Sequence, residues 1–273
     1  MIIGQTKLLE KIDILSKRFP RFVILCGDKG SGKKTICEYI AKKLQMPLVT
    51  CGIKVEDVRN TIDMAYEQFS PIMYMLPDVD TMSPAGKNSL LKVTEEPPKS
   101  AYFILTVCSD SAILDTLKSR GTFLHLDTYT PLELLAYCRL KHYDYTDSEY
   151  NIITSICNTT GEVDILHNNK VMELYEYGKK LALNIHIPKS GNIFKSVKAI
   201  QSKEGESGFD PILTFRVVRN IYFDKGMETH KPQYFEAVKV TSKCIQELSL
   251  VGVSKLGTMD KWIMDVRAAL RGI

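Results

Sequence analysis

Short apolar segments alternate with longer amphipathic segments through the first half of the chain. Five apolar runs have the length and composition of buried strands, at residues 22–26, 48–51, 72–76, 102–107 and 123–126. Between most of them, apolar residues recur every three to four positions, as they do on one face of a helix. Strands that alternate with helices predict an α/β fold whose parallel sheet is covered on both faces.

The amphipathic segments predict helices with recognisable ends. A short helix contains Ile12 and Leu15, and longer helices are predicted over residues 33–44, 55–69 and 83–96. At the last of these, Ser83 fits the N-cap and Pro84 the first helical position. Two prolines after Glu96 would end the helix, because proline cannot continue the hydrogen-bond ladder.

After residue 127 the strand pattern disappears and only helical periodicity remains. Three short helices are predicted between residues 130 and about 177, and further helices follow from residue 178. Breaks are predicted at Gly191, at 203–208 and near 226–231, where glycine, proline and charged residues cluster. We therefore expect three domains: an α/β core at 1–128, a small helical domain at 129–177 and an all-helical domain at 178–273.

Composition fits an ordinary globular protein. The chain has 273 residues, of which 44% are hydrophobic and 25% charged, with a formal net charge of +4. These values exclude disordered, collagen-like and coiled-coil classes. The apolar runs are far shorter than the roughly 20 residues of a spanning helix, and the first residues do not resemble a signal peptide. We expect no membrane partner and a cytoplasmic location.

The seven cysteines point to a reducing compartment. Their number is odd and no pair has the C-x-x-C spacing, so a disulfide framework and a zinc module are not expected. Each cysteine is predicted to pack as a small hydrophobic residue. The histidines, His125 included, also lack ligand spacing. We therefore predict no zinc and no other metal.

A phosphate-binding motif follows the first predicted strand. Residues 27–33 fit G-x-x-x-x-G-K and lead directly into a predicted helix, which is the context that the motif requires. Gly27, Gly30 and Gly32 would let backbone N–H groups surround phosphate oxygens. Lys33 would reach the outer phosphates or, as the alternative, pair with a nearby aspartate such as Asp78. The pattern predicts that this segment descends from a phosphate-binding loop.

The groups that hold a metal beside such a loop are missing. Lys34 stands where a serine or threonine hydroxyl would bind Mg²⁺, and Thr35 lies one helical residue, about 100°, further round. After the third strand, Pro77 occupies the place of the metal-associated aspartate, and Asp78 that of the acidic base. A degenerate site with weak or absent hydrolysis is predicted. No cofactor is certain, and whether ATP or ADP binds stays open.

Several segments in the same order resemble the clamp-loader branch of the AAA+ ATPases. Residues 88–98 read N-S-L-L-K-V-T-E-E-P-P, similar to a signature of that family. Weaker similarities lie at residues 3–5, at 54–59, at the sensor 1 strand around 103–106, and at 119–121, which read S-R-G where the family has Ser-Arg-Cys. The resemblance covers residues 1 to about 126 and implies an AAA+ core, a helical lid and a helical collar.

The resemblance also implies a role within an assembly. In this family, five subunits join through the collar, motor subunits hydrolyse ATP, and the delta-prime type carries a degenerate site of its own. The arginine of the Ser-Arg-Cys motif acts in trans on a neighbour's ATP, so Arg120 is the predicted finger, with a surface arginine that caps the fifth strand as the alternative. Implied partners are the other subunits of a hetero-pentamer, a sliding clamp and primer–template DNA.

The same resemblance gives expectations for further residues. Asp164 stands where the family's lid carries its sensor 2 arginine, which is a third departure from the motor pattern after Lys34 and Pro77. Gly121 replaces the family's cysteine and would loosen the arginine's loop. Three residues on one predicted helix are candidates for DNA-backbone contact, with a solvated helix face as the alternative: Ser83, Lys87 and Lys92.

Three functions remain in competition. The leading hypothesis is a delta-prime-like clamp-loader subunit, deficient in ATPase activity, that supplies Arg120 to a motor neighbour and helps load a clamp onto primed DNA. The second is an active ATPase motor in which Lys34 neutralises phosphate charge in place of metal. The third is an AAA+-derived adaptor outside clamp loading.

Overall fold

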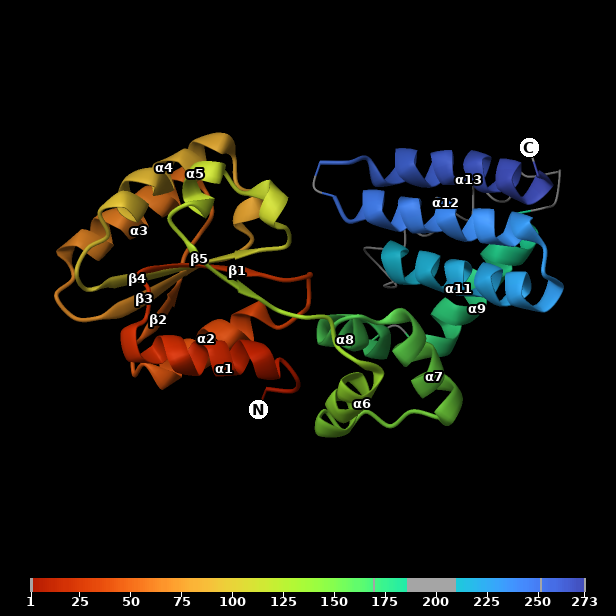
Figure 1. Cartoon of the computed structure of the whole chain (residues 1–273), viewed down its shortest axis with the longest axis horizontal. Coiled ribbons are helices and arrows are strands. Elements are labelled where there is room, and N and C mark those ends of the chain that lie inside the picture. The colour runs from red at the N-terminus through yellow and green to blue at the C-terminus, as the bar shows by residue number, and fades with distance from the viewer. Residues whose placement is uncertain (1, 169, 186–209, 251, 273) are drawn as a thin grey trace. The chain divides into compact units, whose positions relative to one another are not determined.

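The computed structural model describes residues 2–168, 170–185, 210–250 and 252–272 (Figure 1). The chain divides into two compact units. The first comprises Met1–Tyr129 with Thr159–Gly161, and the second comprises Thr130–Asn158 with Glu162–Ile273. The breaks predicted at Gly191 and at 203–208 lie outside the described residues.

The first unit is built on one five-stranded sheet in which every pair of neighbouring strands is parallel. The spatial order is β2-β3-β4-β1-β5, so β1 lies between β4 and β5. The strands are β1 Phe22–Cys26, β2 Leu48–Thr50, β3 Ile72–Leu76, β4 Ala101–Val107 and β5 Thr122–His125. The predicted α/β class is confirmed, and β1 and β3 have the predicted bounds.

Helices cover both faces of this sheet, as Figure 1 shows. Alternate residues of β1 divide between two cores: Ile24 packs with residues of α3 and α4, and Leu25 with residues of α1 and α2. This period-two division follows from the pleat, which points successive side chains to opposite faces. The helices of the two faces are α1 Thr6–Leu15 and α2 Lys33–Lys43, and α3 Val55–Glu67, α4 Pro84–Glu95 and α5 Asp115–Lys118.

Helix α4 begins as the sequence predicts. The Ser83 side chain accepts a hydrogen bond from the Gly86 N–H at 3.2 Å, and Pro84 opens the helix. This cap satisfies a backbone donor that has no partner within the helix. The sequence did not predict α5, because four residues are too short to show helical periodicity.

The second unit is entirely helical over its described residues. Helix α9 runs without a break across residues 177 and 178, where the sequence placed a domain boundary. The division into three domains stays a prediction beside the two compact units found. The helices are α6 Pro131–Leu140, α7 Asp147–Ile156, α8 Thr160–Asn168 (which starts within the first unit), α9 Val171–Asn184, α11 Pro211–Thr229, α12 Pro232–Leu248 and α13 Lys255–Arg271.

Trp262 lies at the centre of the core formed by α9, α11, α12 and α13. Its side chain is 1% exposed, and its ring meets Phe215 edge-on at 4.6 Å between centroids. The indole N–H donates to the Thr241 hydroxyl at 3.0 Å, so its one polar atom is satisfied within the core. The predicted packing role of this tryptophan is confirmed. None of the helices described is long and apolar enough to cross a membrane.

Candidate functional site: a phosphate loop and an exposed arginine

The glycine-rich loop lies between β1 and α2, at the carboxyl end of the sheet. Gly30 and Gly32 have φ values of 80° and 93°, in the left-handed region that favours glycine. Gly27 lacks room for a side chain, since an added Cβ would lie 2.8 Å from Ser31 Oγ and 2.9 Å from Leu126 Cβ. The glycines of the motif therefore serve the loop's backbone conformation and its packing.

The Lys33 side chain hydrogen-bonds to backbone carbonyls of the phosphate loop itself. Its Nζ donates to the carbonyl oxygens of Gly27 at 2.6 Å and Asp28 at 3.1 Å, and lies 3.5 Å from Cys108 Sγ. The residue is 8% exposed. A phosphate would have to replace these hydrogen bonds before the ammonium group could reach it.

A second segment packs against the loop within the same unit. The Gly161 N–H donates to the Gly30 carbonyl at 2.9 Å, and the Thr159 hydroxyl donates to the Lys29 carbonyl at 3.3 Å. An added Cβ on Gly161 would lie 2.6 Å from Gly30 Cα. Two glycine backbones therefore meet directly, which is how residues 159–161 are held against the loop.

We predict that Gly161→Ala destabilises the first unit by about 1–3 kcal/mol. The new methyl group would overlap backbone atoms of Gly30, which no rotamer change can relieve. Urea unfolding monitored by circular dichroism measures the change. Gly86→Ala is the matched control, because its Cβ would meet Met82 Cε at 3.3 Å, the movable end of a side chain. Equal stability of the two variants would contradict the packing argument.

The residues at the positions expected to hold a metal have the following surroundings. Lys34 is exposed and pairs with Glu38 at 4.0 Å, and Thr35 is also exposed. Asp78 is exposed after β3, in a left-handed conformation with φ of 47°, and its N–H donates to the Thr106 hydroxyl at 3.0 Å. Proline at position 77 offers no carboxylate. The position directly after Lys33 therefore offers no hydroxyl, and position 78 offers one exposed carboxylate.

The structure adds a buried carboxylate that the sequence pattern does not reveal. Asp80 is 8% exposed, and its Oδ2 accepts the N–H of Cys108 at 3.3 Å. Ligand atoms of Asp78, Asp80 and Cys108 all lie within 4.8 Å of one another. These residues follow β3 and β4, which pair in parallel, so their carboxyl ends meet at one edge of the sheet. The only available signal was the D-x-D spacing at residues 78–80.

Arg120 follows α5 and is partly exposed. Its Nη2 donates to Glu95 Oε1 at 2.7 Å, and its Nη1 donates to the Thr116 carbonyl at 2.6 Å. Guanidinium has five N–H donors, so these two bonds leave three for another ligand. Because Glu95 belongs to the E-E-P-P signature and Arg120 to the S-R-G segment, the structure joins two motifs that are separate in the sequence.

Gly121 packs tightly beside Arg120. A Cβ at this position would lie 2.6 Å from Ile24 Cδ1 and 3.2 Å from Phe22 Cδ1, both on β1. The absence of a side chain thus lets the loop approach the central strand closely. The sequence expectation of a loosened loop finds no support in this packing.

The three candidate DNA contacts have different surroundings. Ser83 is the α4 N-cap, and Lys87 Nζ donates to the backbone carbonyl of Asp80 at 3.2 Å. Lys92 is exposed. Two of the three side chains therefore have structural contacts, and Lys92 presents a solvated charge.

Asp164 is bonded to two tyrosines in the second unit. Its carboxylate accepts the hydroxyl of Tyr137 at 2.8 Å and that of Tyr143 at 2.9 Å. Burial, and then the bond to Asp164, raise the pKa of Tyr143 to about 12. The carboxylate at the predicted sensor 2 position therefore has a structural function within its own unit.

The structure confirms that most of the cysteines pack as small buried residues. All seven are free thiols, six of them are buried, and Cys108 is half-buried. Burial is the main cause that raises the pKa of the Cys37 thiol to about 12. Such thiols stay protonated at neutral pH and are poor nucleophiles.

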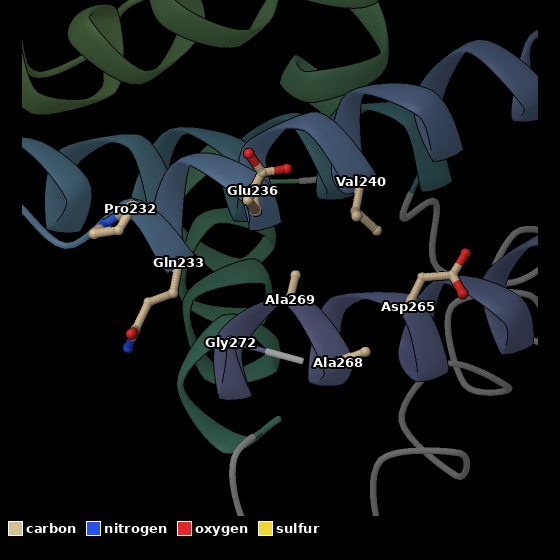
Figure 2. Close-up of a pocket in the computed structure, with 8 residues that line it drawn as sticks. All are labelled: Pro232, Gln233, Glu236, Val240, Asp265, Ala268, Ala269 and Gly272. Atoms are coloured by element: carbon tan, nitrogen blue, oxygen red, sulfur yellow. The ribbon is translucent and has the colours of Figure 1, made fainter.

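A separate groove lies between α12 and α13 in the second unit (Figure 2). Its volume is about 560 Å³, and its walls include Glu236 on α12 and Asp265, Ala268 and Ala269 on α13. The small alanine side chains leave the space open. None of the residues that line it was a candidate from the sequence.

Comparisons with known proteins find similarity to subunits of DNA polymerase III. A family model described as "DNA polymerase III, delta subunit" matches residues 50–130, which include Arg120 and the E-E-P-P signature. DNA polymerase III subunit gamma of Buchnera aphidicola (from Acyrthosiphon pisum) is 28% identical over 189 residues, 55% of this chain and 52% of that protein. DNA polymerase III subunit delta' of Yersinia pestis is 38% identical over 78 residues, 28% and 23% of the two chains.

Solved structures show the same fold at low sequence identity. A gamma subunit-related protein of DNA polymerase III from Thermotoga maritima has a TM-score of 0.51 and 14% identity, over 97% of this chain and 99% of that one. The RuvB Holliday junction branch migration motor of the same organism has a TM-score of 0.53 and 18% identity, over 77% and 86%.

The parallel sheet and the glycine-rich loop define a P-loop protein with the AAA+ fold. In sequence the chain is similar to the clamp-loader branch of the AAA+ proteins, through the family model at residues 50–130 and the matches to gamma and delta' subunits of DNA polymerase III. It spans about half the length of the gamma subunit, and less of the delta' subunit, that it matches.

Proposed function

We propose that this chain is a delta-prime-like subunit of a clamp loader, without ATPase activity of its own. It would supply Arg120 to the ATP site of a neighbouring motor subunit and help to load a sliding clamp onto primed DNA. One contrast carries the proposal. Arg120 keeps three N–H donors for a ligand, while Lys34 and Pro77 replace the groups that would hold Mg²⁺.

The chemistry proposed for Arg120 is electrostatic. Charge on a transferring phosphoryl group spreads over its oxygens, and a guanidinium can donate two N–H groups to them. Glu95 would hold the arginine side chain in place until the neighbour's phosphates compete for it. The pair is partly exposed, so its own contribution to stability is small and it can open at little cost.

Assembly and DNA contact complete the proposal. The helices α11, α12 and α13 would form the collar that joins neighbouring subunits in a hetero-pentamer. Lys92, with Ser83 and Lys87 on or beside the same helix, would lie near the DNA backbone. Contacts of this kind are independent of base sequence and weaken as salt rises.

The purified chain alone is predicted to show no Mg-ATP turnover above background. Without a hydroxyl after Lys33 and with proline at 77, nothing in those two positions binds the Mg²⁺ that neutralises the developing charge. A coupled phosphate-release assay measures the rate, and Lys33→Ala is the comparison. Turnover that disappears in Lys33→Ala would overturn the proposal and support the motor alternative. Failure to co-assemble with any motor subunit would support the adaptor alternative.

A further inference from the structure

Three potential metal ligands lie together at the carboxyl ends of β4, β1 and β5. Cys26 is the last residue of β1, His125 is the last residue of β5, and Asp110 follows β4. Cys26 and His125 are direct partners in the parallel register, so their side chains lie on the same face of the sheet. The sulfur, one imidazole nitrogen and one carboxylate oxygen all lie within 4.8 Å of one another.

The distances allow the three ligand atoms to reach one ion. In a tetrahedral zinc site, ligand atoms about 2.0–2.3 Å from the ion lie roughly 3.3–3.8 Å from one another. The three ligand atoms here lie within 4.8 Å of one another, so they would have to approach one another on binding. Side-chain rotations at the ends of the strands would supply that approach.

The polar atoms of this cluster are not fully satisfied by the protein. Asp110 Oδ1 is buried and has no hydrogen-bond partner in the described part of the chain. The Cys26 thiol is about 3.8 Å from the Cys108 carbonyl, which is a weak contact. His125 is exposed and stacks on Phe123 with ring centroids 5.7 Å apart, which orients the imidazole. A buried carboxylate oxygen without a donor is costly, and a cation would satisfy it.

We infer that Cys26, Asp110 and His125 form a binding site for a zinc-like divalent transition metal. Sulfur and imidazole ligands favour such ions, whereas Mg²⁺ and Ca²⁺ prefer oxygen. Three protein ligands leave a fourth tetrahedral position for water. On binding, the thiol loses its proton to solvent and the sulfur coordinates as thiolate.

This site differs from the phosphate site and does not depend on the proposed function. The metal would join the ends of three strands next to Gly27, where the phosphate loop begins. Sequence spacing could not reveal it, because the ligands lie at positions 26, 110 and 125 and meet only through the strand order. The metal would hold the edge strand β5 to its neighbour β1.

Titration of the purified full chain with Co²⁺ tests the inference. We expect one equivalent to produce the visible bands of tetrahedral cobalt and a thiolate-to-cobalt charge-transfer band, both removed by Zn²⁺. Cys26→Ser should lose the charge-transfer band. His125→Ala should bind at least ~10-fold more weakly, since loss of even an outer-shell partner costs 10–100-fold. Cys244→Ser, a buried cysteine outside the cluster, should bind as the wild type does.

Cys108→Ser separates this site from the neighbouring Asp78, Asp80 and Cys108 group. We expect that variant to keep the charge-transfer band, and its loss would overturn the inference. Absence of the band in the wild type, or its persistence in Cys26→Ser, would do the same. If Cys26→Ser does not fold, the exposed His125 decides the matter: unchanged Co²⁺ affinity in a folded His125→Ala would also overturn it.

Discussion

Arg120→Ala should reduce ATP hydrolysis at the neighbouring motor site by at least ~10³-fold, which is the lower range for arginine fingers supplied in trans. The variant loses every guanidinium donor, including the three that are not used by Glu95 and Thr116. Its fold should survive, because a partly exposed ion pair contributes at most about 1 kcal/mol. The measurement is clamp- and DNA-stimulated hydrolysis by an assembly reconstituted with motor subunits, under single-turnover conditions.

Two further variants make the Arg120 experiment specific. Lys118→Ala removes a nearby cation that pairs with Asp115 on α5, and it should leave hydrolysis unchanged. Arg120→Lys keeps the charge but loses the planar fork, so its rate should fall between the other two. Native mass spectrometry confirms that each assembly is complete. An Arg120→Ala assembly that is complete and hydrolyses ATP at the wild-type rate would refute the trans-finger role.

Trp262→Ala should destabilise the second unit by about 3–5 kcal/mol, the usual cost of truncating a large buried aromatic side chain. The indole is 1% exposed, and its removal leaves a cavity beside Phe215 and an unfilled acceptor at Thr241. Urea unfolding followed by far-ultraviolet circular dichroism measures this. Circular dichroism is used because Trp262 is the chain's single tryptophan, so the substitution removes the tryptophan fluorescence that would otherwise report unfolding.

Controls for Trp262→Ala come from the same helix. Met264→Ala removes a side chain that is 62% exposed and should change stability by no more than about 0.5 kcal/mol. Trp262→Phe keeps a ring against Phe215 but loses the donor to Thr241, so its loss should be intermediate. Equal midpoints for Trp262→Ala and Met264→Ala would show that the tryptophan is not central to the core.

Much of the α/β unit could be predicted because its signals are local. The apolar runs that became β1 and β3 have the predicted bounds, and Ser83 caps α4 as expected. Glycines and lysine in a fixed spacing after a strand also identified the phosphate loop. The four-residue α5 was not predicted, since it is shorter than the period that reveals a helix.

The candidate site was predictable only in part. The sequence predicts that Lys33 contacts phosphates, and the structure adds its hydrogen bond to the Gly27 carbonyl. Asp80 escapes sequence reasoning, because D-x-D after a strand does not tell which carboxylate is buried. The sequence predicts an unfavourable charge at Asp164, and the structure adds the hydrogen bonds that its carboxylate accepts from two tyrosines. In each case the structure adds the partner of a side chain rather than the element that carries it.

The amino-acid pattern alone established the α/β class and the resemblance to clamp loaders, and it predicted the phosphate loop and the loss of the metal-holding groups. Those properties depend on residues a few positions apart, whose spacing reflects the geometry of a strand, a turn or a helix. The tertiary structure decided that Arg120 pairs with Glu95, that Gly161 packs on Gly30, and that Cys26 meets His125. These contacts join residues 25 to 131 positions apart along the chain. Strand order and helix packing bring them together, and no local periodicity encodes either one.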